Sequence, residues 1–110
     1  MTKEMVPFRV IYLDMPDEIR GKMFGCTTYD QGRYFVFIDK DLDEQARRDA
    51  LRHELSHIIL GHLTDPRTTN DHVYLENFDS VEAEACEYAS RMTDDELDQL
   101  MEYADMIRTI

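Results

Sequence analysis

Two histidines and a glutamate near the middle of the chain have the spacing of a metal site. The run His53-Glu54-Leu55-Ser56-His57 has the form HExxH. On an α-helix, residues four positions apart lie one turn apart on the same side, so both imidazoles can reach one zinc ion. Glu54 projects about a quarter-turn away, where its carboxylate can hold a water bound to the metal. The motif predicts His53 and His57 as zinc ligands and Glu54 as a general base.

A third ligand must come from elsewhere in the sequence. The continuation HxxGxxH of one class of zinc hydrolases needs glycine at position 60 and histidine at position 63. The chain has Leu60, Gly61, His62 and Leu63, so this class is excluded. On a continuous helix His62 would lie on the opposite side from the pair, and we interpret it as a helix-end residue. The remaining candidates are carboxylates of a later predicted helix: Glu82, Glu84 and Glu87.

The helical pattern does not choose cleanly among these three carboxylates. Glu82 and Glu84 lie on opposite edges of the apolar stripe, and Glu87 lies further out. Glu84 stacks between Val81 and Tyr88, at i−3 and i+4, so it can point inward. We interpret Glu82 and Glu87 as exposed carboxylates of an acidic helix, and Glu84 is mildly favoured as the ligand.

The elements that position the motif are predicted to be strands in the first part of the chain and helices after them. The runs expected to form strands are rich in β-branched and aromatic residues, and the expected helices begin at capping-box patterns. The second half of the motif helix is apolar, which predicts that it is buried. The predicted elements are a strand at 8–13, a turn or short helix at 17–22, strands near 23–29 and 33–39, and helices at 41–62, 79–92 and 93 to about 107.

The least regular stretch, residues 61–78, is long enough to form the rim of an active site. His72 and Tyr74 within it are candidate donors for an oxyanion or a substrate. Cys86 is expected to be a small buried residue, since a helical residue two positions from Glu84 faces away from it. With Cys26 it is expected to be a reduced thiol.

Composition predicts one globular domain spanning residues 1–110. The chain is 43% hydrophobic and 33% charged, with a net charge of −12 that argues against direct binding to nucleic acid or an anionic membrane. The segment from Glu76 onward contains eleven acidic residues and only two arginines. An acidic surface formed by this segment would suit a basic partner. There is no apolar run of signal-peptide or membrane-span length, so we expect a cytoplasmic protein.

Residues 47–62, followed by residues 82–92, resemble the ImmA/IrrE family of zinc metallopeptidases. That family has an HELGH-type helix and then an ExEAxxFA segment, whose Glu directly before Ala is the third zinc ligand. The resemblance implies His53, His57 and Glu84 as ligands of Zn²⁺ and Glu54 as the base. It also implies a small zincin-like α+β domain, with about three strands (a strand plus a hairpin) packed on a central HExxH helix and two further C-terminal helices.

This chain departs from the family pattern at several positions near the ligands. Ser56 replaces the usual Gly, Cys86 stands where Asn or Asp is common, and Tyr88 replaces Phe. The family's Leu-Leu-Met-Pro after the second segment is absent. The residues that correspond to the metal ligands are all retained.

Members of the family are typically encoded near phage or mobile-element repressors and relieve repression. The resemblance therefore implies a zinc-dependent endopeptidase whose protein substrate is a DNA-binding repressor of the helix-turn-helix class. Two alternatives stay open. One is a zinc-containing binding module that regulates its partner without proteolysis, as an anti-repressor. The other is a structural acidic domain with a chance HExxH.

Overall fold

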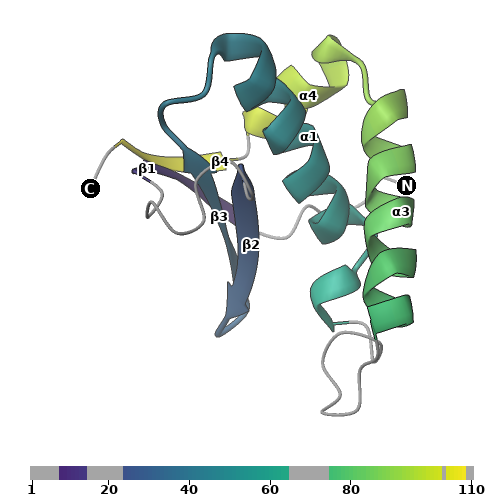
Figure 1. Cartoon of the computed structure of the whole chain (residues 1–110). Helices are drawn as coiled ribbons and strands as arrows, with labels where there is room; N and C mark the ends of the chain where they lie inside the picture. Colours follow the sequence, from purple (N-terminus) through teal and green to yellow (C-terminus); the bar gives the residue numbers. More distant parts are fainter. Residues whose placement is uncertain (1–7, 15–23, 65–74, 103, 109–110) are drawn as a thin grey trace.

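A mixed four-stranded sheet with helices on one side forms the described part of the chain (Figure 1). The structure is a computed structural model, and it describes residues 8–14, 24–64, 75–102 and 104–108. The strands lie in the order β2-β3-β1-β4. Their bounds are Phe8–Leu13 for β1, Gly25–Asp30 for β2, Arg33–Asp39 for β3 and Ala104–Arg108 for β4. No helix of the described residues is long and apolar enough to cross a lipid bilayer.

The predicted strand and hairpin are confirmed. β2 and β3 pair antiparallel, and β3 then pairs parallel with β1. Gln31 and Gly32 connect the hairpin with φ of 50° and 79°. A two-residue loop with both φ values positive matches the right-handed twist of the flanking strands. The short piece predicted at 17–22 lies outside the described residues.

The helices pack in two layers beside the sheet. α1 lies between the sheet and α3, contacting β2 and β3 on one side and α3 on the other (Figure 1). The α+β class, with a central motif helix and two C-terminal helices, is confirmed. The helix bounds are Glu44–Ile59 for α1, Leu75–Arg91 for α3 and Asp94–Met101 for α4, with a 3₁₀ turn, η1, at His62–Thr64.

Three predicted helix boundaries were wrong. α1 begins after Asp43, whose carboxylate accepts a hydrogen bond from the Ala46 amide at 2.8 Å, and not at Asp41. The Asp41 amide instead donates to the side chain of Asp39, which extends the turn after β3. α1 ends at Ile59 instead of about His62. α3 begins at Leu75, one turn before the predicted start at residue 79.

The third predicted helix is cut short by the fourth strand. α4 is capped by Thr93 as predicted, with the Glu96 amide donating to the Thr93 hydroxyl at 3.1 Å. It ends at Met101, and Ala104–Arg108 pairs parallel with β1. The apolar spacing favoured helix as far as residue 107. Pairing with the free edge of β1 overrides that local preference.

The core fills the space between the sheet and the helices. β1 and β3 each direct alternate side chains towards α1, as strand geometry requires. The buried residues of this cluster are Phe8, Val10, Tyr34, Val36, Ile38, Leu51, Leu55, Ile58, Met92 and Leu97. The second half of α1 is therefore fixed on both sides, and the motif residues are presented at its contact with α3.

Candidate metal centre

The two motif histidines converge as the helical spacing predicts. His53 and His57 lie one turn apart on α1, and their Nε2 atoms are 3.2 Å apart. The side chain of His57 is 12% exposed and that of His53 is 25% exposed. Burial lowers the pKa of His57 to about 4, so its imidazole is neutral at pH 7. A neutral imidazole is the form that binds a metal ion.

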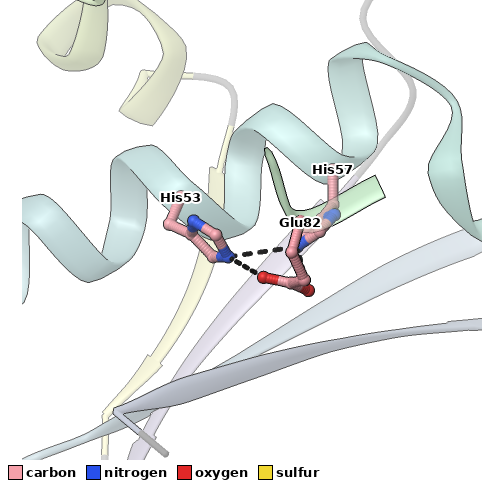
Figure 2. A group of neighbouring side chains, drawn as sticks. All are labelled: His53, His57 and Glu82. Carbon is pink, nitrogen blue, oxygen red and sulfur yellow. Dashed lines mark hydrogen bonds and ion pairs between the residues drawn. The ribbon is translucent and has the colours of Figure 1, made fainter. Parts of the chain in front are cut away.

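Glu82 of α3 completes a three-residue cluster with the pair (Figure 2). One carboxylate oxygen of Glu82 lies 2.8 Å from Nε2 of His53, and the other lies 3.2 Å from Nε2 of His57. The Glu82 side chain is 55% exposed, so the cluster opens to solvent. Glu82 was expected to be a surface carboxylate. It is exposed, yet it is the acidic residue that the structure brings to the histidines.

The spacing of these atoms fits a zinc ion. Two ligands at about 2.0–2.1 Å from one ion, at a tetrahedral angle, lie about 3.3 Å from each other. The two histidine nitrogens are 3.2 Å apart, each histidine has a different oxygen of Glu82 at 2.8 or 3.2 Å, and one ligand atom from each of the three residues lies within 4.8 Å of the other two. Two imidazoles and one carboxylate are also the donor set of catalytic zinc sites with an open fourth position. The donors and their spacing therefore suit a catalytic metal.

Glu84 lies on another side of α3. The structure places its Oε1 3.7 Å from Nε2 of His62, and Glu84 is not part of the cluster with His53 and His57. Residues two apart on a helix point in different directions, so Glu82 and Glu84 cannot both face the pair. The contact between α1 and α3 brings Glu82 to the histidines.

His62 lies beside His57, contrary to the prediction that it would face away. The Nδ1 atoms of the two rings are 2.9 Å apart, and His62 is only 2% exposed. The prediction assumed an unbroken helix. α1 instead ends at Ile59, and Gly61 takes a φ of 71°, which turns the chain back on itself. The left-handed conformation after a helix end is typical of glycine.

Glu54 occupies a buried position next to the edge strand β2. It is 7% exposed, and its Oε1 accepts a hydrogen bond from the Thr27 hydroxyl at 2.7 Å. Burial raises the pKa of this carboxyl, while the hydrogen bond from Thr27 acts in the opposite direction. A raised pKa suits a group that must both accept and release a proton. Thr27 was not predicted, because no local sequence pattern shows which strand residue contacts the motif helix.

Cys86 is exposed, so the prediction of a buried thiol was wrong. Its Sγ lies 3.7 Å from Nδ1 of His53. Cys86 and Glu82 are four residues apart on α3 and therefore share a face. The i, i+4 spacing that brings the two histidines together also places Cys86 on the same face of α3 as Glu82. Since Glu82 faces α1, Cys86 does so too.

A cavity of about 720 Å³ adjoins the cluster and Glu54. Its walls combine the polar groups of the cluster with apolar side chains, including the exposed Phe24 just before β2. β2 has only β3 as a neighbour among the described strands, so its other edge pairs with none of the strands that the structure describes. His72 and Tyr74 lie outside the described residues. The cavity is also lined by small and apolar residues: Gly25, Cys26, Ala46, Ala50, Leu63 and Val81.

Comparison with known proteins yields one match. The family model described as Peptidase_M78, IrrE N-terminal-like domain, matches residues 6–107. No curated protein and no solved structure matches the chain. The match spans nearly the whole sequence and includes both the motif helix and α3. The chain belongs to the M78 family of metallopeptidases, with an IrrE N-terminal-like domain.

Proposed function

We propose that the chain is a zinc-dependent endopeptidase in which His53, His57 and Glu82 hold the metal. The observation that carries this proposal is the convergence of the three ligand atoms beside the buried carboxylate of Glu54. When bound, zinc polarises the scissile carbonyl and lowers the pKa of a coordinated water towards about 7. Glu54 takes the proton of the attacking water and delivers it to the leaving amine.

The edge of β2 is the proposed platform for the substrate. An extended peptide that pairs with an unpaired strand edge gains main-chain hydrogen bonds, and adjacent pockets select its side chains. β2 lines the cavity with Gly25, Cys26 and Thr27, and Thr27 contacts Glu54 directly. A peptide on this edge would therefore run past the general base. We assign the oxyanion contact to His72 or Tyr74.

We further propose that the substrate is a helix-turn-helix repressor of a phage or mobile element, that cleavage relieves repression, and that this occurs in the cytoplasm. This part of the proposal depends on the resemblance to the ImmA/IrrE family and on charge. A chain of net charge −12 attracts a basic DNA-binding protein.

Metal analysis of the purified protein tests the zinc site. We expect one zinc per chain in the wild type, loss of that zinc in Glu82→Gln, and retention in Glu87→Gln, a control on the same helix. Glu87 pairs with Arg91 and lies away from the cluster. Absence of zinc in the wild type, with no change in melting on adding the ion, would contradict the proposal.

Glu54→Gln tests proteolysis separately from metal binding. This variant should retain zinc and lose cleavage of a repressor encoded beside the gene, because the amide cannot accept the proton. If Glu54→Gln still relieves repression in cells, the protein acts as a non-proteolytic anti-repressor and the endopeptidase proposal is wrong.

A further inference from the structure

The second ring nitrogen of each motif histidine faces away from Glu82 and meets another side chain. Both Nε2 atoms are directed to the Glu82 carboxylate. Nδ1 of His57 lies 2.9 Å from Nδ1 of His62, and the two rings meet edge to face, with centroids 5.1 Å apart. We propose that His62, with Glu84 behind it, is a positioning residue that orients His57 and fixes its tautomer. This inference rests on the proposed zinc site.

The tautomers of the two rings follow from the contacts. If Nε2 of His57 is the ligand atom, a neutral His57 ring carries its proton on Nδ1 and must donate it. Among the described residues, Nδ1 of His62 lies within hydrogen-bond distance of that nitrogen. Nδ1 of His62 therefore accepts, and the proton of the neutral His62 ring is on Nε2. Nε2 is the atom that lies nearest Glu84, at 3.7 Å from Oε1.

The arrangement is a carboxylate–imidazole–imidazole chain that ends at a proposed metal ligand. Ligating histidines commonly donate their other N–H to a carboxylate, a carbonyl or a water, which fixes the ring and makes it a better ligand. Here a second imidazole accepts that hydrogen bond. The negative charge of Glu84 favours the His62 tautomer that leaves Nδ1 free to accept.

Burial of His62 argues for a role beyond packing. Its side chain is 3% exposed in a region where an apolar residue would avoid the cost of burying a polar ring. The chain reaches this position through the left-handed turn at Gly61. Through the same contacts, Glu84 acts on His62, and His62 acts on the proposed ligand His57. This role explains why Glu84 points toward His62, although it is not itself a ligand.

Variants of His62 and Glu84 test the inference, with zinc affinity measured by competition with a chelator. His62→Leu should weaken zinc binding by about 10-fold to 100-fold, since it removes the acceptor. His62→Asn should restore most of the affinity, because its Oδ1 occupies nearly the place of Nδ1. Glu84→Gln, one step further out, should lose less than about 10-fold. Glu87→Gln is the matched control and should equal the wild type.

Nitrogen-15 NMR of the full-length zinc-loaded protein gives a readout independent of activity. With Nε2 of His57 bound to zinc, we expect slow solvent exchange of its Nδ1 proton in the wild type and in His62→Asn, where that proton is hydrogen-bonded, and faster exchange in His62→Leu. If His62→Leu does not fold, His62→Asn and Glu84→Gln carry the test through their zinc affinities and the NMR spectrum.

The outcomes separate this inference from the proposed function. Wild-type zinc affinity in His62→Leu, together with unchanged exchange of the His57 Nδ1 proton, would overturn the positioning role and leave the zinc site intact. Complete loss of zinc in Glu84→Gln, with retention in Glu82→Gln, would make Glu84 the ligand and overturn the inference. A wild type without zinc would reject the proposed function itself, and would remove the basis for this role.

Discussion

Glu54 is held in place by a strand residue that lies far from it in the sequence. The hydroxyl of Thr27 donates to its Oε1, which fixes one carboxylate oxygen of a residue that lines the cavity. A general base must lie within hydrogen-bond reach of the proton that it removes. In the proposed mechanism, Thr27 therefore restricts the orientation of the general base Glu54.

Replacing Thr27 tests this orientation. Thr27→Val keeps the shape of the side chain and removes the hydroxyl, so kcat should fall by about 10-fold while the zinc content stays unchanged. Thr28→Val is the control, because Thr28 is exposed and faces the other side of the sheet. Equal kcat values for the two variants would show that the contact with Thr27 has no part in catalysis.

At the scale of single residues, the sequence predicts positions within one helix better than contacts between helices. His53 and His57 were predicted because the i, i+4 spacing alone makes their rings meet. The choice between Glu82 and Glu84 depends on how α3 rotates against α1, which the apolar stripe left open. His62 was misplaced because its position depends on the backbone conformation of Gly61.

At the scale of elements, the end of α1 is part of the site. The amide of Gly61 donates to the Ile58 carbonyl at 3.1 Å, and the φ of 71° at Gly61 then redirects the chain into η1. A β-carbon added at Gly61 would meet no atom of the described residues within 4 Å beyond its immediate chain neighbours, so within this part of the chain the opposition to substitution comes from backbone strain. This turn is what brings His62 next to His57.

Gly61→Ala should destabilise the protein and disturb the site together. The left-handed conformation costs an alanine about 1 kcal/mol, which corresponds to a melting temperature lower by roughly 5 °C. Zinc affinity should fall as well, since His62 moves with the turn. Gly61→Asn, which tolerates this conformation better, should lose less on both measures. Wild-type melting and zinc affinity in Gly61→Ala would contradict the role of the turn.

A cluster of ion pairs attaches the first half of α1 to the start of α4. Arg48 contacts Asp94 and Asp98 at 3.2 and 3.0 Å, and Arg52 also contacts Asp94. Arg52 donates to the Met92 carbonyl at 3.1 Å as well. Hydrogen bonds from Arg48 and from Arg52 lower the pKa of Asp94. The folded state therefore favours the charged form of this carboxyl.

The lowered pKa of Asp94 predicts how the stability of Asp94→Asn, relative to the wild type, changes with pH. Because the folded pKa lies below the unfolded value, the stabilisation is present above about pH 4 and is lost as the pH falls through the folded pKa. Asp94→Asn should melt below the wild type at pH 7, and the difference should shrink towards pH 3. Asp95→Asn, an exposed neighbour, is the control. A difference that is the same at both pH values would contradict this explanation.

The elements themselves were predicted where the local pattern and the tertiary contacts agree. The observed bounds of β1 and β3 match the predicted ones, and Thr93 caps α4 as predicted. β4 was predicted as helix because its apolar spacing continues that of α4. Only the free edge of β1, which lies more than ninety residues earlier, makes it a strand.

At the scale of the whole molecule, charge bears on the choice of partner. The net charge is −12, and the acidic residues are concentrated from α3 onward. Charge attraction of this kind raises association rates and weakens with salt. Under the proposed function, this charge selects for basic proteins before the active site is engaged.

Salt dependence tests this selection. For a basic helix-turn-helix protein, kcat/KM should fall by about 10-fold between 50 mM and 500 mM salt, mostly through KM. For an uncharged peptide that contains the same cleavage site, kcat/KM should change little. The same salt dependence for both substrates would show that the acidic surface does not recruit the partner.

His53, His57 and Glu82 are proposed to bind one zinc ion. Anomalous scattering at the zinc edge, from crystals of the zinc-loaded protein, locates the metal directly. We predict a single strong peak at about 2.0–2.2 Å from Nε2 of His53, Nε2 of His57 and a carboxylate oxygen of Glu82. A peak coordinated by Glu84 in place of Glu82, or no peak beside the two histidines, would contradict this assignment of the zinc ligands.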